Sequence, residues 1–263
     1  MRKLRKYGKS PFKVAVIHGG PGAPGSVAPI ARELSRDFGV LEPLQTVTTI
    51  NGQLSELKRV VTKNGKIPVI LIGHSWGAWL GYIFAAHYPS LVKKLILVSS
   101  GPFEPKHVKK LQATRLNRLN QKERAEYNSI IKNLDNPKVK DKNKLLERLG
   151  ELTSKTDSYD PIADKSNKSD LIMVQGDLFQ KVWKEAEELR RNGRLLSLGK
   201  GISCPVIAIH GDYDPHPAQG VKKPLSTILK DFRFILLKNC GHYLWLERKA
   251  KDKFYKVLRE ELS

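Results

Sequence analysis

The sequence is poor in cysteine, in long apolar runs and in acidic residues, and each shortage narrows what the protein can be. Only two cysteines occur among 263 residues, Cys204 and Cys240, which excludes a disulfide framework and is typical of a reducing compartment. No apolar run approaches the roughly 20 residues that span a bilayer. The basic start of the chain is not followed by the apolar stretch of a signal peptide, so we expect a cytoplasmic protein.

The shortage of acidic residues leaves a large positive charge. Basic residues outnumber acidic ones by 47 to 26, and the formal net charge is +21. Such an excess is found in nucleic-acid-binding proteins, but here the basic residues are interspersed with Glu and Asp, and no DNA-reading motif occurs. We therefore expect a lysine-rich solvated surface, with no specific nucleic-acid partner and no membrane partner. Clusters with metal-ligand spacing are also missing, so we expect no bound metal.

What the chain does contain is a regular alternation of strand and helix patterns. From residue 12 to 102, short apolar runs alternate with helical patterns, which is typical of a parallel, doubly wound sheet. Between 103 and 200 the sequence is charged, helical in pattern and poor in strand signals. Strand patterns then return. These changes predict an α/β fold with a mostly parallel sheet: a first core part over 1–102, a helical cap over 103–200, and a second core part over 201–263.

The most informative motif is G-H-S-W-G at residues 73–77. The apolar run 68–72 precedes it and a helical pattern over 78–88 follows it. A strand, a sharp turn and a helix around G-x-S-x-G form a nucleophile elbow, in which a strained turn lifts the serine hydroxyl clear of the sheet. The glycines keep Cβ atoms out of the close approach between strand and helix. The sequence therefore predicts that Ser75 is a nucleophile.

Two later elements offer an acid and a base in the chain order Ser, Asp, His that this architecture requires. The strand pattern 204–210 runs into a loop with two aspartates, Asp212 and Asp214. The strand pattern 232–237 is followed by a glycine and then by His242. Of the seven histidines, only this one combines the chain order with such a context. We therefore predict His242 as the base and one of the two aspartates as the acid.

Together these motifs make the chain similar to the α/β-hydrolases over nearly its whole length. H-G-G-P-G at 18–22 occupies a further family position, and with S-W-G it narrows the resemblance to the proline iminopeptidase branch, whose members cleave an N-terminal residue from short peptides. By the family's spacing from Gly211, the resemblance implies that Asp214 is the acid. It also implies an oxyanion hole formed by the backbone amides of Gly20 and Trp76, and it implies no cofactor.

Other residues near these motifs are weaker candidates. Glu104 stands where some relatives carry a displaced acid. We expect His210 to be a strand-end histidine packed in the core. His216 lies between two prolines, which leaves two alternatives: a residue at the mouth of the pocket or a solvated loop residue, and we expect the second. His18 and His74 adjoin the predicted site, but in such positions histidines more often orient loops than transfer protons.

The predicted cap covers the serine, excludes water and shapes the substrate pocket. Its last long helical pattern carries Phe179, Trp183 and Glu185, which we predict to bind substrate. Leu178 of the same pattern is a further candidate for the pocket wall. Glu187 and Glu188 of the same pattern are further carboxylates. If the substrate carries a free ammonium group, at least one of the three carboxylates has to point into the pocket.

The sequence thus predicts a serine hydrolase that cleaves a small ester or amide through an acyl-enzyme, with a small molecule or a short peptide as substrate. The resemblance favours an aminopeptidase of the proline iminopeptidase type. The chain departs from that branch in its short stretch before the first strand and in the segment 99–104, which leaves a general carboxylesterase or acyl hydrolase equally open. A ligand-binding member of the fold without turnover is a third alternative. The sequence leaves the oligomeric state open.

Overall fold

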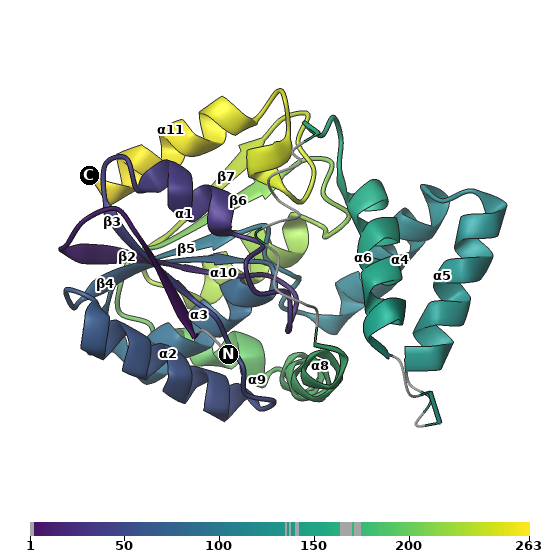
Figure 1. Ribbon diagram of the computed structural model, residues 1–263, viewed down its shortest axis with the longest axis horizontal. Helices are drawn as coiled ribbons and strands as arrows, with labels where there is room; N and C mark the ends of the chain where they lie inside the picture. The colour runs from purple at the N-terminus through teal and green to yellow at the C-terminus, as the bar shows by residue number, and fades with distance from the viewer. Residues whose placement is uncertain (1–2, 135, 137, 140–141, 164–169, 171–174) are drawn as a thin grey trace.

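A seven-stranded sheet forms the centre of the protein (Figure 1). The computed structural model describes residues 3–134, 136, 138–139, 142–163, 170 and 175–263. The strands lie in the order β1-β3-β2-β4-β5-β6-β7, and every neighbouring pair is parallel except β1 with β3. Their bounds are β1 (Leu4–Tyr7), β2 (Phe12–Ile17), β3 (Gly39–Pro43), β4 (Val69–His74), β5 (Val92–Val98), β6 (Val206–Gly211) and β7 (Phe232–Leu237). The prediction of a mostly parallel α/β sheet is therefore confirmed.

Different helices cover the two faces of this sheet (Figure 1). Because side chains alternate along a strand, successive residues of β2 serve the two faces in turn. Ala15 and Ile17 pack with α2, α3 and α10, whereas Val14 and Val16 pack with α1 and α11. Burial on both faces explains why the central strands read as continuous apolar runs. The helix bounds are α1 (Ala28–Leu34), α2 (Ile50–Asn64), α3 (Trp76–His87), α10 (Gln219–Ile228) and α11 (Lys251–Leu262).

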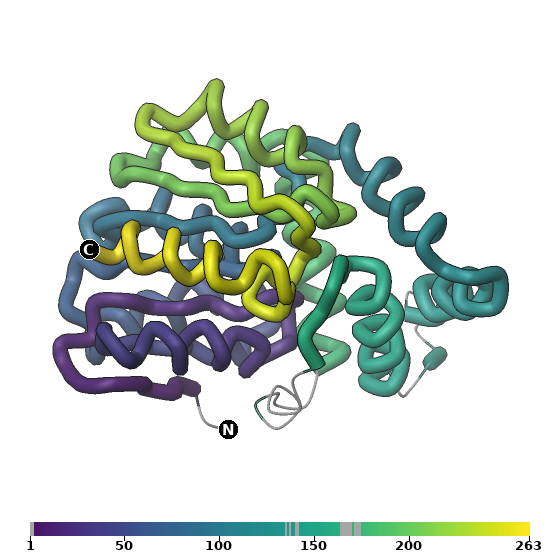
Figure 2. The backbone as a smooth tube through the Cα atoms, turned by 90° about the horizontal axis from the view of Figure 1, so that it is seen from above, coloured from purple at the N-terminus to yellow at the C-terminus, as the bar shows by residue number. Residues whose placement is uncertain are grey.

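The described residues between β5 and β6 are mostly helical, and those from 105 to 157 lie beside the sheet (Figure 2). The helices are η2 (Pro105–His107), α4 (Val108–Asn117), α5 (Gln121–Leu134), α6 (Lys142–Asp157), α8 (Gly176–Arg191), α9 (Arg194–Ser197) and η3 (Leu198–Gly201), where η marks a 3-10 helix. Two further 3-10 helices are η1 (Pro89–Leu91) and η4 (Leu244–Leu246). α5 and α6 share a small apolar core that includes Tyr127, Ile130 and Leu146. In contrast, α8 joins the main core through Leu178 and Val182.

Neither cysteine forms a disulfide: Cys240 is buried and Cys204 is partly buried. Within the described ranges, no helix combines the length and the apolar character that a membrane crossing needs. The cytoplasmic location and the limits of the cap stay predictions.

Candidate active site

The turn between β4 and α3 has the strained geometry of a nucleophile elbow. Ser75 lies in this turn with φ 54° and ψ −113°, a conformation that non-glycine residues rarely adopt. A Cβ atom on Gly73 would collide with the carbonyl oxygen of Gly77, and one on Gly77 would collide with that of Ile17. The two glycines therefore allow strand, turn and helix to come together, and the turn leaves Ser75 partly exposed at the carboxyl end of the sheet.

The loops after β6 and β7 bring one aspartate and one histidine together at the same end of the sheet. His242 donates a hydrogen bond from Nδ1 to Oδ2 of Asp214 over 2.8 Å, and both residues are buried. The competing carboxyl, Asp212, is exposed, accepts a bond from the backbone of Cys240 and lies 3.7 Å from Lys238. Of the two candidate acids, only Asp214 contacts the predicted base.

Glu104, the alternative acid, lies in the segment between β5 and η2. Glu104 forms an ion pair with Lys106 at 2.9 Å, and its carboxylate lies 3.7 Å from Nε2 of His107. These partners lie in its own loop, and Glu104 is not among the residues that line the pocket at Ser75. The geometry gives this carboxylate no part in orienting His242.

Asp214 is held as a buried carboxylate by more than one donor. The backbone N–H and the Nδ1–H of His216 both donate to its Oδ1, over 2.9 and 2.7 Å. Burial opposes ionisation of this carboxyl, but electrostatic interactions with His242, His216 and His210 and these hydrogen bonds hold its pKa well below the usual range. Asp214 is therefore negatively charged at neutral pH.

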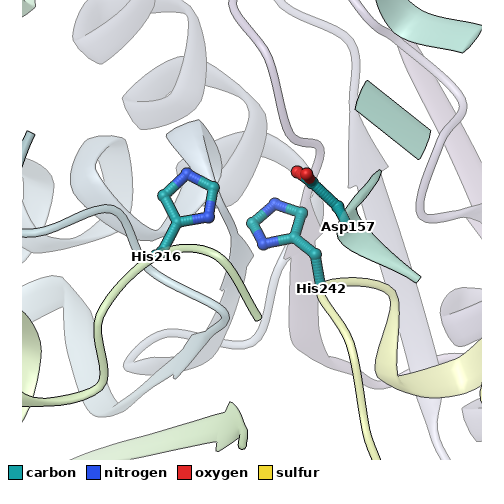
Figure 3. A group of neighbouring side chains, drawn as sticks. All are labelled: Asp157, His216 and His242. Carbon is teal, nitrogen blue, oxygen red and sulfur yellow. The ribbon is translucent and has the colours of Figure 1, made fainter. Parts of the chain in front are cut away.

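His216 is not the solvated loop residue that we expected; it lines the pocket at Ser75, which was the other alternative. It is only 8% exposed, and its ring stacks on that of His242 with centroids 4.5 Å apart (Figure 3). Burial lowers the pKa of His216 to about 4, although Asp214 acts in the opposite direction, so the imidazole is neutral at pH 7. The physical reason is an Asx turn: the Asp214 side chain accepts the N–H two residues ahead, which folds His216 inward. The Asp-Pro pair at 214–215 is the sequence signal that indicates such a turn.

Another buried histidine, His74, supports the loop that carries the base. Its Nε2 lies 3.2 Å from the carbonyl oxygen of His242, and its ring packs edge-on against Trp245. Burial, together with the nearby His242, lowers the pKa of His74 well below its usual value. A neutral histidine bonded to a backbone carbonyl orients a loop, as we expected for this position.

The backbone around Ser75 offers amides for an oxyanion. Trp76 is the first residue of α3, so its N–H has no acceptor within the helix and lies at the positive end of the helix dipole. The loop after β2 lies directly against the serine, because a Cβ atom on Gly19 would stand 3.3 Å from the Cβ of Ser75. The next residue, Gly20, has a left-handed φ of 41°. The oxyanion-hole roles of Gly20 and Trp76 stay predictions.

A pocket of about 180 Å³ opens at Ser75 and Trp76 and continues between α3 and the helices α4, α5, α6 and α8, which belong to the predicted cap. Phe179 and Trp183 of α8 line it, whereas Leu178, the third apolar candidate, packs into the main core instead. Trp183 stacks between Trp79 of α3, at 5.9 Å, and Phe179, at 6.0 Å, with interplanar angles of 3° and 10°. The resulting aromatic wall joins the cap to the core beside the serine.

Glu185, in contrast, does not enter this pocket, contrary to our prediction. Its carboxylate accepts a hydrogen bond of 2.8 Å from the N–H of Ile50, at the start of α2. Glu187 lines the pocket instead. Helical spacing explains the difference, because Glu187 follows Trp183 by one turn whereas Glu185 follows it by half a turn. Glu188 pairs with the exposed Arg191 and also lies outside the pocket.

Two arginines of the cap also line the pocket, and our sequence reasoning missed both. Arg115 forms a two-armed ion pair with Asp157, whose pKa it lowers against the effect of burial. The second, Arg190, lies 3.4 Å from Glu187 and over the ring of Trp79. The Arg115 pair joins residues 42 positions apart, so no local pattern marks it. Arg190 stands on the same helical face as Trp183, and the helical spacing was a usable signal.

Asp157, His216 and His242 bring three ligand-type atoms within 4.8 Å of one another (Figure 3). Each side chain is already engaged by the protein. Asp157 is bound by Arg115, and both histidines donate from Nδ1 to Asp214. The group is therefore explained without a cation.

Ser75 and His242 are not joined by a hydrogen bond in the described part of the chain. The side chain of His242 is 5% exposed and that of His216 is 10% exposed. Because both Nδ1 atoms are bound to Asp214, Nε2 is the nitrogen that each ring has left for a further contact. Catalytic hydrogen bonds are commonly looser in the absence of substrate.

Comparison of the sequence with known proteins identifies a matching family and a similar enzyme. The α/β hydrolase fold family matches residues 52–249. The chain is 25% identical over 296 aligned residues to a proline iminopeptidase of Saccharolobus solfataricus, covering 98% of this chain and 87% of that protein. The resemblance to the proline iminopeptidase branch is thereby confirmed.

Solved structures share the fold at low sequence identity. The crystal structure of VinJ superposes with a TM-score of 0.69 at 17% identity, over 98% of this chain and 93% of that chain. The crystal structure of the proline iminopeptidase of Mycobacterium smegmatis superposes with a TM-score of 0.63 at 18% identity, with the same two coverages. At these identities, the likeness concerns the fold alone.

Proposed function

The chain belongs to the α/β-hydrolase fold family, and from this premise we propose that it is a serine hydrolase with Ser75 as nucleophile. One observation carries the proposal. The strained turn presents Ser75 at the end of the sheet where Asp214 and His242 form a buried hydrogen bond of 2.8 Å. Such a grouping is what acyl transfer through a serine requires.

In the proposed reaction, His242 takes the proton of the Ser75 hydroxyl as Oγ attacks the carbonyl carbon of the substrate. Asp214 fixes the ring with its proton on Nδ1 and stabilises the imidazolium that forms. The amides of Gly20 and Trp76 bind the oxyanion, each contributing on the order of 3 kcal/mol. His242 then gives its proton to the leaving group, and water hydrolyses the acyl-enzyme.

The pocket supports a small substrate with an apolar acyl part. Its volume is about 180 Å³, and Trp79, Phe179 and Trp183 give it an aromatic wall. We therefore propose small esters or amides as the substrate class. The site needs no cofactor for this chemistry.

An aminopeptidase of the proline iminopeptidase type is the narrower candidate. The similar protein of S. solfataricus and the position of Glu187 in the pocket favour it, because a carboxylate there suits a free ammonium group. The pairing of Glu187 with Arg190 favours the alternative, a carboxylesterase, because the carboxylate already has a cationic partner. A screen of short-chain aryl esters against aminoacyl anilides, the prolyl one included, separates the two.

Labelling with a fluorophosphonate probe tests the proposal itself. The parent protein should react, and Ser75→Ala should not. Ser55→Ala, on the exposed side of α2, is a matched control and should react like the parent. Equal labelling of the parent and Ser75→Ala, or no labelling of the parent, would contradict the proposal.

A further inference from the structure

Asp214 is bound by two imidazoles rather than by one. The usual arrangement for a serine hydrolase requires a single histidine on the acid. Here His242 takes Oδ2 and His216 takes Oδ1. We propose that His216 is a positioning residue, which clamps Asp214 in the orientation that His242 needs. The inference rests on the proposed function of Ser75, Asp214 and His242.

The geometry of the carboxylate makes such a clamp effective. Oδ1 of Asp214 accepts two bonds from His216, from the backbone N–H at 2.9 Å and from Nδ1–H at 2.7 Å. Because a carboxylate is planar, fixing Oδ1 in this way also fixes the direction in which Oδ2 faces His242. Rotation of Asp214 away from the base would break both bonds in a buried site, where unpartnered donors are costly.

His216 is itself held in place from three directions. Its carbonyl oxygen lies 2.8 Å from Nε2 of His210, at the end of β6. Its ring stacks on that of His242 at 4.5 Å and 23°. Pro215 and Pro217 flank it and restrict the backbone. A donor that is fixed this firmly can orient its acceptor, which a mobile surface side chain cannot.

The protonation state of His216 suits the task. Its surroundings contain Asp214 and His210 from its own strand and loop, His242 from the loop after β7, and Asp157 and Arg115 from the cap. Buried among them, the ring stays neutral at pH 7 and donates one hydrogen bond without adding a charge. A lysine or arginine at this position would instead add a second cation beside Asp214, which would weaken the interaction of this carboxylate with protonated His242.

Three substitutions separate positioning from other roles. His216→Asn keeps an amide N–H near the position of Nδ1, His216→Gln keeps one near the position of Nε2, and His216→Leu keeps neither. The rate of fluorophosphonate labelling of Ser75 reports the machinery without knowledge of the natural substrate. We expect His216→Leu and His216→Gln to label about tenfold to a hundredfold more slowly, because one bond to a buried charge is lost, and His216→Asn to stay within about threefold of the parent.

The pH profile gives a second readout that a purely structural role would not move. In His216→Leu, the Asp214 carboxylate accepts one hydrogen bond fewer. It therefore interacts more strongly with the protonated form of His242 and stabilises that form. The acidic limb of kcat/KM for an aryl ester should therefore move to higher pH in His216→Leu and stay in place in His216→Asn. His87→Leu and His87→Asn, at the far end of α3, are matched controls for loss of a histidine and should leave both readouts unchanged.

The outcomes are distinct. Equal labelling rates in all three His216 variants and the parent would overturn the clamp while leaving the serine hydrolase intact. Rescue by Gln and not by Asn would also overturn it, because the needed group would then be Nε2, in contact with substrate. Loss of labelling equal to that of a His242→Ala variant would make His216 the base and contradict a positioning role. Absence of labelling in the parent would contradict the proposed function instead.

Discussion

Glu187 lies 3.4 Å from Arg190 in the wall of the pocket that opens at Ser75. The side chain of Arg190 is 8% exposed, whereas that of Glu187 is 51% exposed. An ammonium group that enters the pocket would therefore have to share Glu187 with a cation that is already buried there. The choice between aminopeptidase and esterase depends on whether this carboxylate binds substrate.

If Glu187 binds an ammonium group, Glu187→Gln should raise KM for an aminoacyl anilide by about tenfold, the usual order of one ion pair in a partly buried site. Hydrolysis of an uncharged aryl ester should hardly change. Glu188→Gln is the control, because Glu188 lies on the same helix outside the pocket. Equal effects of Glu187→Gln on both substrates would remove the ammonium role and favour an esterase.

If Asp214 is the acid, its substitution should lower kcat far more than substitution of Asp212. Asp214→Asn should keep the fold but lower kcat by about three to four orders of magnitude, because the histidine is then held in the wrong tautomer. Asp212→Asn should have a far smaller effect, since that carboxylate contacts a backbone amide and not His242. Steady-state hydrolysis of an aryl ester measures both. The reverse ranking of the two variants would show that the acid has been misassigned.

The buried neutral histidines predict a dependence of stability on pH. Burial lowers the pKa of His18 and that of His216 to about 4, whereas an unfolded chain has about 6.5. Their stabilisation is thus complete above pH 6.5 and is lost as the pH falls towards 4, by about 2 kcal/mol for each group at pH 5. Urea unfolding at pH 7.5, 6 and 5 should show this decline, with a smaller slope for His216→Asn. A free energy of unfolding that is constant over this range would contradict the neutral, buried state.

Glu185 should matter for stability and not for catalysis. Its carboxylate accepts the N–H of Ile50 at the start of α2, where helices favour a negative group. Glu185→Ala should lower the free energy of unfolding by about 1 kcal/mol and leave kcat/KM for an aryl ester unchanged. Thermal unfolding and ester hydrolysis of the same preparation measure both. A fall in kcat/KM without a loss of stability would return Glu185 to the substrate site.

The fold and the elbow could be predicted because their signals are local. The apolar runs of the buried parallel strands are continuous, and Gly73 and Gly77 mark a close approach that only glycine permits. The edge strand β1 was not predicted. Its sequence, LRKY, is polar, and its pairing with β3 is antiparallel and joins residues far apart in the chain. Such a pairing leaves no periodic pattern of its own.

Site residues could be predicted where chain order and motif spacing determine them. They could not be predicted where their positions depend on contacts between segments that are far apart in the chain. His242 follows from its position after a strand, and the resemblance to the α/β-hydrolases implies Asp214 in place of Asp212. The inward turn of His216 and the pairing of Arg115 with Asp157 depend on contacts between separate segments. The composition of α8 does not separate Glu185 from Glu187, whereas their helical phases differ. Counting turns from Trp183 indicates Glu187 and Arg190 directly.

An acyl group that passes through Ser75 can be trapped on the protein during turnover. The protein is mixed with an activated aryl ester and quenched within the first turnovers, and its peptides are analysed by mass spectrometry. The peptide that contains Ser75 should gain the mass of the acyl group, and His242→Ala should form far less of this adduct. An adduct on another residue, or hydrolysis by Ser75→Ala at the parent rate, would contradict acyl transfer through Ser75.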